Sequence, residues 1–416
     1  MSFDISMNRP AQSALVPLRE LRALAAVARD GGIRPSTETL LRTASAVSRA
    51  IAQLELRLGM PAFERRGRGM LPTAAGRLAY DRFCRIEQEL GLVLDEAARG
   101  ARMPARTAAA VEELFDERRL LAASLLAETG HMPTVAGRLG VSQPAISAAV
   151  ARLEDALHEK LFRRTPQGMV PSIAGARWLV RFDRALAELR YLNQDIAALR
   201  GSMAGVIVIG ALPLARTRIL PQAISALRAL HPELRVNARE SPYEQLSAEL
   251  LSGKLDFIIG ALRSGTDEAL HHELLFTDEL CVMAARGHPL AQRRRLELAD
   301  LRGQSWVLSR PGTPLRETLG KFFASHGEPA PVPAVETGDQ ALVRGMLVTG
   351  GMLTVLSAHQ LQYEVEAGQL CMLPVPLEGL GRRIGITTRR GAQLPASVWA
   401  LLDEIRKASR AAAAPS

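Results

Sequence analysis

The chain contains one segment twice, and this duplication limits what it can fold into. The stretch from Ala46 to Gly76 recurs from Ala145 to Gly175, and every matching pair is 99 residues apart. The match continues without a gap over roughly fifty-five positions, which indicates an internal duplication. Two copies are too few for a solenoid, so each copy must be a small domain that folds together with its neighbours.

Length and charge indicate a polyanion-binding part joined to a globular part. A chain of 416 residues has room for about three domains. Residues 1–200 carry 29 Lys and Arg against 22 Asp and Glu, whereas residues 201–416 carry 23 against 21. A basic front half favours a module that binds a polyanion. The alternative is that this surplus is ordinary surface charge.

Cysteine usage and hydropathy predict a cytoplasmic protein without membrane contact. Cys84, Cys281 and Cys371 are scattered and form no CxxC pair, which is typical of a reducing compartment. Residues 1–17 lack a basic region followed by an apolar run, so we expect no signal peptide. The longest apolar stretch, about fourteen residues, is too short to span a bilayer.

Changes of pattern divide the chain into four parts. The first repeat is followed by a trailing helix, a short linker from Gly100 to Thr107 and the second repeat. A long amphipathic helix comes next, and strands then alternate with helices. The predicted domains are residues 18–97, 108–175, 176–200 and 205–408.

The long helix over residues 176–200 has the apolar spacing of a two-stranded seam. Asn193 interrupts the apolar run, and a polar residue inside such a seam commonly fixes its register. The spacing predicts pairing with a second copy of the chain; the alternative is a face packed on its own domain. The seam residues are Leu179, Phe182, Leu186, Leu189 and Ile196.

Alternating strands and helices after Gly205 imply a parallel α/β sheet. Two such sets suggest two lobes with a cleft between them, the usual place for a small ligand. The predicted fold is therefore multidomain, with two helix-rich domains, a linker helix and a two-lobed α/β domain.

In the second repeat, residues 134–157 have the pattern of two short helices joined by a turn. Ser142 is a good N-cap, and Pro144 lies in the first turn, where its missing N–H costs nothing. One face of the helix is apolar, and the other is small and polar. Such a face fits the roughly 12 Å wide major groove, where Gln can bind adenine. We predict DNA contact by Ser142, Gln143, Pro144, Ala145, Ser147, Ala148 and Arg152.

A basic hairpin follows this helix. Phe162 anchors the strand that carries Arg163 and Arg164, and a glycine-containing turn runs from Thr165 to Met169. Arginine at this place can reach flanking phosphates, which supply most of the binding energy.

Together these residues resemble the winged helix-turn-helix of LysR-type transcriptional regulators. The resemblance implies that residues 176–200 are the dimerising linker helix. It also implies that residues 205–408 are an effector domain, similar in fold to periplasmic solute-binding proteins. The expected partners are a double-stranded DNA operator, a small effector and further copies in a homodimer or homotetramer, with RNA polymerase contacted indirectly. The matching residues include Val135, Ala136, Leu139, Val141 to Ser147, Leu153, Glu154, Leu157, Leu161, Phe162, Arg164, Ala174 and Gly175.

The first repeat departs from the family layout. Its corresponding helix begins Thr43-Ala44-Ser45 and lacks the Gln and Pro of the second copy. Two interpretations are open: a second DNA-contacting domain, or a domain retained for dimer packing. We favour weak contact dominated by phosphates, made by Ser45, Ser48, Arg49, Arg65, Arg66 and Arg68.

Loops before helix N-termini are the candidate effector site. Free N–H groups there favour carboxylate or hydroxyl ligands, and the resemblance places the family's effectors at such loops. Arg216 and Arg310 could clamp an acid, or could be ordinary solvated arginines. We expect a sugar or a small carboxylic acid bound by Leu212, Pro213, Arg216, Thr217, Ser309, Pro311, Gly312, Thr313 and Gly338.

No catalytic, metal-binding or cofactor-binding motif is found. His271 and His272 lack a third ligand at metal spacing. A cleft alone does not argue for an enzyme. The prediction is a sequence-specific, ligand-responsive regulator, and the alternative is a solute-binding or enzymatic α/β protein with helical interaction modules.

Overall fold

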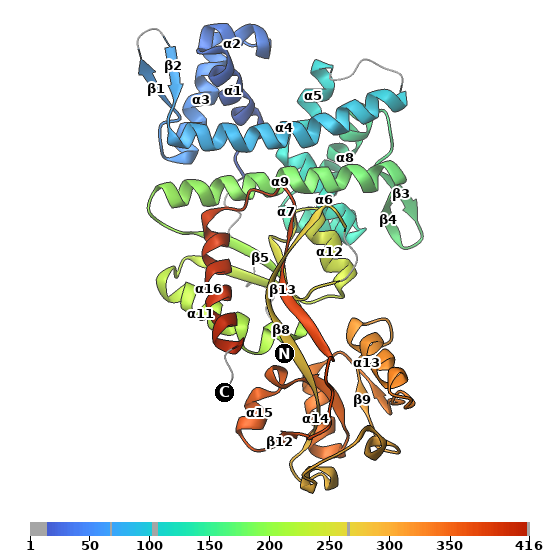
Figure 1. The fold of residues 1–416 in the computed structure, drawn as a ribbon. Helices are drawn as coiled ribbons and strands as arrows, with labels where there is room; N and C mark the ends of the chain where they lie inside the picture. The colour runs from blue at the N-terminus through green and yellow to red at the C-terminus, as the bar shows by residue number, and fades with distance from the viewer. Residues whose placement is uncertain (1–14, 67–68, 102–106, 264–266, 414–416) are drawn as a thin grey trace, which may run out of the picture.

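A computed structural model describes residues 15–66, 69–101, 107–263 and 267–413 (Figure 1). A helical front half, built around two long helices that lie side by side, stands over an α/β domain. None of the described helices has both the length and the hydropathy needed to cross a membrane.

The two repeats form two copies of one small domain, here called the first head and the second head. Every element of the first copy has a counterpart that begins 99 residues later. A further helix, α5 (Ala108–Leu114), precedes the second head. The first copy comprises α1 (Leu18–Asp30), α2 (Ile33–Leu40), α3 (Ala44–Leu58), β1 (Phe63–Arg66), β2 (Gly69–Pro72) and the long α4 (Ala74–Ala101). The second comprises α6 (Glu117–Thr129), α7 (Met132–Leu139), α8 (Gln143–Leu157), β3 (Phe162–Thr165), β4 (Gly168–Pro171) and the long α9 (Ile173–Leu199).

A buried carboxylate at the end of α8 fixes the hairpin that follows it. Glu154 Oε1 accepts hydrogen bonds from the backbone N–H groups of Leu161 (3.0 Å) and Phe162 (3.3 Å). Glu55 does the same in the first head for Ala62 and Phe63. These bonds satisfy donors that would otherwise be orphaned at the strand start, and they explain why both copies carry Glu at this position.

Glycine is required where each long helix crosses the chain before its hairpin. A Cβ at Gly175 would lie 2.0 Å from the carbonyl oxygen of Leu161, and one at Gly76 would lie 2.0 Å from that of Ala62. No side chain fits at such a distance. Both copies therefore share the close approach that sets the angle between hairpin and long helix.

The apolar seam of α9 packs against α4 of the same chain. The buried residues of both helices repeat at intervals of three and four, in the same register 99 residues apart. We expected this seam to pair with a second copy of the chain; the structure shows the alternative, a face packed within its own chain. Of the predicted seam residues, Leu186 is half-buried and the other four are buried. The paired sets are Phe83, Ile86, Leu90, Val93 and Ala97 on α4, and Phe182, Ala185, Leu189, Leu192 and Ile196 on α9.

Ion pairs show that the two long helices are antiparallel and related by an approximate two-fold axis. Arg82 binds Glu188 at 2.7 Å, and Arg181 binds Glu89 at 2.9 Å. Arg82 corresponds to Arg181, and Glu89 corresponds to Glu188, by the 99-residue offset. The same contact is therefore made twice in opposite directions, which is the pattern of an isologous contact. The backbone N–H of Leu18 donates to Glu117, its own counterpart, at 3.1 Å. A residue can touch its counterpart only near the axis. The two heads of one chain are thus arranged as the two halves of a dimer.

The α/β domain has two lobes joined by one sheet. The strand order is β11-β8-β13-β7-β5-β6, with β12 also paired to β8. β5 runs parallel to β6 and β7, whereas β13 is antiparallel to β7 and β8, and β11 and β12 are antiparallel to β8. The predicted parallel sheet is therefore wrong for β8, β11, β12 and β13: the sheet is mixed, because strand and helix alternation does not fix the direction of strands that cross between lobes. The long strands β8 and β13 pass between the lobes (Figure 1), and separate apolar cores lie on either side. The sheet strands are β5 (Gly205–Ala211), β6 (Leu234–Arg239), β7 (Phe257–Ala261), β8 (Leu270–Ala285), β11 (Thr354–Ser357), β12 (Leu370–Met372) and β13 (Gly381–Arg389).

Helices cover this sheet, and a short two-stranded sheet stands beside it in the second lobe. α11 packs against the C-terminal helix α16. The helices are α10 (Pro213–Thr217), α11 (Ile219–Leu230), α12 (Tyr243–Leu251), α13 (Pro314–Ser325), α14 (Gln340–Gly350), α15 (Gln362–Glu366) and α16 (Ala396–Ala413). The short sheet pairs β9 (Val307–Leu308) with β10 (Val335–Glu336).

The α/β domain docks on α9. Tyr191 is buried in its core, and the Tyr191 hydroxyl donates to Asp256 at 2.7 Å. Asp256 also pairs with Arg190 and accepts a bond from the backbone N–H of Val208 at 2.7 Å. Leu92, the counterpart of Tyr191 on α4, is 41% exposed. The two-fold symmetry of the heads therefore does not extend to the α/β domain.

The reciprocal ion pairs make a matched stability test. Replacing Arg82→Ala leaves the buried Glu188 with Arg85 alone, whose Nε lies 3.8 Å away, and we expect this to lower the free energy of unfolding by about 3–5 kcal/mol. Replacing Arg181→Ala, its counterpart, should cost at most about 1 kcal/mol, because that pair is more exposed and Glu89 keeps Arg184 at 3.4 Å. Urea unfolding of both variants measures the difference.

The pH dependence provides a second check. Burial raises the pKa of Glu188, while Arg82 opposes the rise. A carboxyl with a raised pKa in the folded state is stabilising when protonated and becomes costly as the pH rises. The defect of Arg82→Ala should therefore shrink as the pH falls toward the raised pKa of Glu188. Equal losses for the two variants at all pH values would contradict the role given to burial.

Candidate DNA-binding heads and effector site

In the second head, α8 presents the predicted contact face to solvent. Ser142 caps the helix by accepting a bond from the backbone N–H of Ala145 at 3.4 Å. All of the predicted contact residues of this helix are exposed, and the opposite face is buried. The exposed residues are Ser142, Gln143, Pro144, Ala145, Ser147, Ala148 and Arg152; the buried ones are Ile146, Val150, Leu153 and Leu157.

The hairpin of the second head holds two exposed arginines beside this helix. Arg163 and Arg164 lie on β3, which is antiparallel to β4. The backbone N–H of Met169 donates to the carbonyl of Gly130 at 2.8 Å, so the hairpin is tied to the end of α6. A Cβ at Gly168 would lie 2.6 Å from the same carbonyl, and its φ is +122°. Glycine is needed there on both grounds.

The first head has the same geometry with a different surface. Ser45, Ser48 and Arg49 are exposed on α3. The backbone of Arg65 and Arg66 lies in β1, paired with β2, and Arg68 lies outside the described residues. Ser36 is fully buried at the position that Val135 occupies in the second head. A buried hydroxyl costs free energy unless it is bonded, and Ser36 donates to the carbonyl of Ile33 at 2.8 Å.

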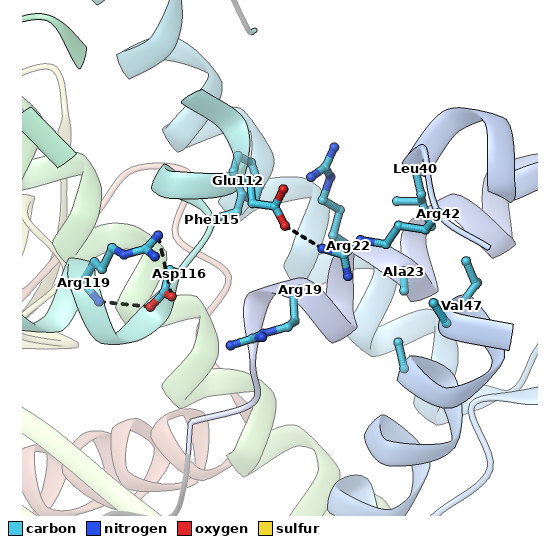
Figure 2. Close-up of a pocket in the computed structure, with 12 residues that line it drawn as sticks. Arg19, Arg22, Ala23, Leu40, Arg42, Val47, Glu112, Phe115, Asp116 and Arg119 are labelled. Atoms are coloured by element: carbon cyan, nitrogen blue, oxygen red, sulfur yellow. Dashed lines mark hydrogen bonds and ion pairs between the residues drawn. The ribbon is translucent and has the colours of Figure 1, made fainter. Parts of the chain in front are cut away.

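The two heads meet at a small cavity of about 150 Å³ (Figure 2). Arg42, in the turn before α3, pairs with Glu112 of α5 at 2.7 Å and so joins the two copies across it. Arg119 pairs with Glu113 on the other side. Figure 2 shows Arg19 and Arg22 of α1 near the Arg42–Glu112 pair. The junction is polar and contributes to holding the heads in one relative orientation.

In the α/β domain, two of the predicted effector loops leave neighbouring parallel strands. β9 pairs with β10, and the backbone N–H of Thr337 donates to the carbonyl of Leu308 at 2.9 Å. Ser309 and Gly338 therefore follow the same edge, at the carboxyl ends of parallel strands, where ligands of such sheets bind. The Ser309 and Thr313 hydroxyls are 2.9 Å apart. Pro311, Gly312 and Gly338 are exposed.

The remaining predicted loop reaches this edge from the other lobe. Leu212 caps α10, which begins at Pro213 and ends at Thr217. The Thr217 hydroxyl lies 3.4 Å from both Gln340 Oε1 and the carbonyl oxygen of Gln360. The two lobes thus touch where the three loops come together.

A third arginine lies near this edge, besides the two that the sequence favoured. Arg310 is exposed, and Arg216 pairs with Glu240. Arg316, one turn into α13, lies 3.9 Å from Glu336 and has a buried Nη1 with no hydrogen-bond partner among the described residues. The Nε2 of Gln340 is also buried and has no hydrogen-bond partner among the described residues. Sequence reasoning missed Arg316 and Gln340, although both stand in the first turn of a helix that follows a predicted loop.

Comparison with known families agrees with this architecture. A model described as "Bacterial regulatory helix-turn-helix protein, lysR family" matches twice, at residues 18–77 and 118–176. A model described as "LysR substrate binding domain" matches residues 200–410. The chain belongs to the LysR family of transcriptional regulators. Members bind DNA and have an effector-binding domain, so this chain is a DNA-binding transcriptional regulator and not an enzyme.

Relatives differ in whether they include the first head. HTH-type transcriptional regulator GalR of Pseudomonas putida is 43% identical over 395 residues, covering 94% of this chain and 96% of that protein. The regulator OxyR of Escherichia coli is 30% identical and covers 68% of this chain but 92% of its own length. The duplicated layout is therefore shared with GalR, whereas OxyR has the length of a single-headed chain.

Solved structures match in fold over the same single-headed length. A full-length OxyR variant from Pseudomonas aeruginosa has a TM-score of 0.56 at 23% identity and covers 70% of this chain and 95% of its own. CbnR, a LysR family regulator, has a TM-score of 0.52 at 20% identity, with 71% and 99% covered.

The exposed arginines of the second hairpin generate a salt-dependence test. If Arg163 and Arg164 contact phosphates, replacing both with Ala should flatten the slope of log K against log salt by roughly one to two. Arg228, exposed on α11, serves as a matched control whose loss should leave the slope unchanged. Fluorescence anisotropy over a salt series measures it. An unaltered slope in the double variant would remove this hairpin from the interface.

Proposed function

We propose that this regulator binds its operator in the cytoplasm, with α8 in the major groove, and that a small carboxylate bound between the lobes changes that binding. The observation that carries the first part is the exposed face of α8. Its first turn is small and polar, and its opposite face is held in the core. Such a surface admits close approach to base edges.

The side chains of this face suggest their roles. Gln143 stands at the first position of α8, where its amide can bind adenine in two hydrogen bonds. Ser147 and Arg152 follow on the same exposed face and suit bases or phosphates. Ser142 already caps the helix, so its share in DNA contact is limited to the groups that capping leaves free.

The polar groups at the meeting of the lobes favour an acidic effector over a sugar. Buried N–H groups of Arg316, Gln340 and Arg216 have no hydrogen-bond partner among the described residues. Each of these is a donor, and a carboxylate offers acceptors only. A sugar hydroxyl needs acceptors from the protein as well. Charge-assisted bonds from arginine add strength.

The route from effector to DNA runs through α9. Phe182 and Leu189 belong to the core of the heads, while Ala187 and Tyr191 belong to the core of the first lobe. A change in the lobes that displaces Tyr191 therefore acts on the helix that carries the second head. A homodimer or homotetramer would form through surfaces other than the α4–α9 seam, and contact with RNA polymerase would follow indirectly from DNA binding.

The DNA part of the proposal is tested at Gln143. Replacing Gln143→Ala should weaken binding by roughly 1–3 kcal/mol at one or two base pairs of the operator and leave random DNA almost unaffected. Gln167→Ala, in the exposed turn of the hairpin, is the control. Competition assays with single base-pair changes locate the effect. Equal loss on specific and random DNA would refute the placement of α8 in the groove.

The effector part is tested by thermal shift against panels of carboxylic acids and sugars. A ligand at 100 times its dissociation constant adds about 2.7 kcal/mol to the free energy of unfolding. We expect this response from an acid, its loss in Arg316→Met, and its retention in Arg310→Met, where the side chain is exposed. A response to sugars alone, or one that survives Arg316→Met, would overturn the assignment.

A further inference from the structure

We infer that a single chain of this regulator spans two half-sites, and that its operator is asymmetric in base sequence. The inference rests on the proposed contact between heads and DNA. It goes further because it assigns both half-sites to one polypeptide and makes them unequal. The two heads are related by an approximate two-fold axis, but their exposed residues differ.

The two-fold relation is built into one chain. The reciprocal pairs Arg82–Glu188 and Glu89–Arg181 and the shared apolar seam pack α4 and α9 of one chain on each other, so this seam is occupied without a second copy. The hairpins of the two heads lie at opposite ends of this helix pair (Figure 1). A duplex has a two-fold symmetric backbone, so proteins with two-fold related heads bind inverted half-sites. Here one chain supplies both heads.

The reading surfaces of the heads are not equivalent. At three exposed positions of α3 and α8 that match by the 99-residue offset, the side chains differ. Gln143 of α8 corresponds to Ala44 of α3, and Ala148 corresponds to Arg49. Arg152 of α8 corresponds to Gln53 of α3. Arg favours guanine and Gln favours adenine, so the order of these preferences along the helix is changed between the heads.

A homodimer of identical single heads has to read the same sequence twice. This chain does not, because its two heads are different stretches of one polypeptide. The expected operator has two half-sites in inverted orientation that differ in base sequence. Half-site A is bound by the first head and half-site B by the second. An asymmetric operator also orients the chain, and with it the α/β domain, whose core includes residues of α9 and none of α4.

The experiment uses the full-length protein and a duplex selected by it from a random library. Three duplexes are compared: the selected AB, and the symmetric AA and BB. We expect AB to bind at least about tenfold more tightly than either symmetric duplex, with one AB duplex bound per chain by native mass spectrometry. One duplex per two chains, or equal affinity for AB and BB, would overturn the inference.

A graft between the heads supplies the matched variant. Ala44→Gln, Ser45→Pro, Arg49→Ala and Gln53→Arg together give residues 44–53 of α3 the exposed residues of 143–152 in α8, all at solvent-facing positions. The graft should move the preference from AB to BB by at least about tenfold. An unchanged preference for AB would show that α3 does not read DNA and would sink the proposal.

The single substitution Arg49→Ala covers the case in which the graft fails to fold. It should weaken AB and AA and leave BB almost unchanged, whereas Gln143→Ala should weaken AB and BB. If Arg49→Ala affects all three duplexes alike, the assignment of half-site A to α3 is wrong. Failure of the wild-type chain to select any duplex would instead count against the proposed function as a whole.

Discussion

Arg82 is the contact on which the arrangement of the whole molecule depends. Its buried guanidinium, on α4, binds Glu188 and Asp195 of α9 at 2.7 and 2.8 Å. It also donates to the carbonyl of Gln393, just before α16, at 2.7 Å, and lies 5.2 Å from the ring centre of Tyr191. One side chain thus joins the first head, the second head and the α/β domain. Buried charges of this kind are costly unless every partner is in place, so the contact favours one arrangement over others.

The duplication accounts for the two-fold symmetry of the two heads. The copies differ where one of them contacts the single α/β domain and the other does not. Inside the seam, matching positions of the two copies are apolar and buried. Where the hairpin meets the long helix, both copies have glycine, Gly76 and Gly175, because both have the same close approach of the backbone. Outside the seam, matching residues of the two copies differ in type and in burial. Tyr191 is buried under the α/β domain, while its counterpart Leu92 is exposed. The chain carries two heads for one effector domain, which contacts the head pair through Tyr191 of α9 and Arg82 of α4.

How far the sequence predicted this structure depended on whether a feature was local. The buried and exposed faces of α8 followed from helical spacing, since Ile146 and Leu157 must share a face whatever lies opposite. The apolar spacing of α9 also predicted its seam. Spacing alone does not determine whether the helix that packs on the seam comes from a second copy or from the same chain. The sequence pattern predicts a strand only near Leu280 to Ala285, whereas β8 begins at Leu270; its first half was missed because charged residues interrupt the apolar run. Arg316 and Gln340 were missed because their burial comes from the meeting of two lobes, which no local pattern records.

The shared use of α9 explains how a small ligand can act on DNA binding at a distance. The helix belongs to two cores at once, with Phe182 and Leu189 on one side and Ala187 and Tyr191 on the other. Close-packed cores move as bodies and do not deform smoothly. On the proposed function, a ligand that changes the angle between the lobes acts through the first lobe, which holds α9 at Asp256 and Tyr191, and shifts α9 against α4. Because that shift changes the relative placement of two covalently linked heads, it acts on both half-sites together, without the dissociation that a dimer of separate chains permits.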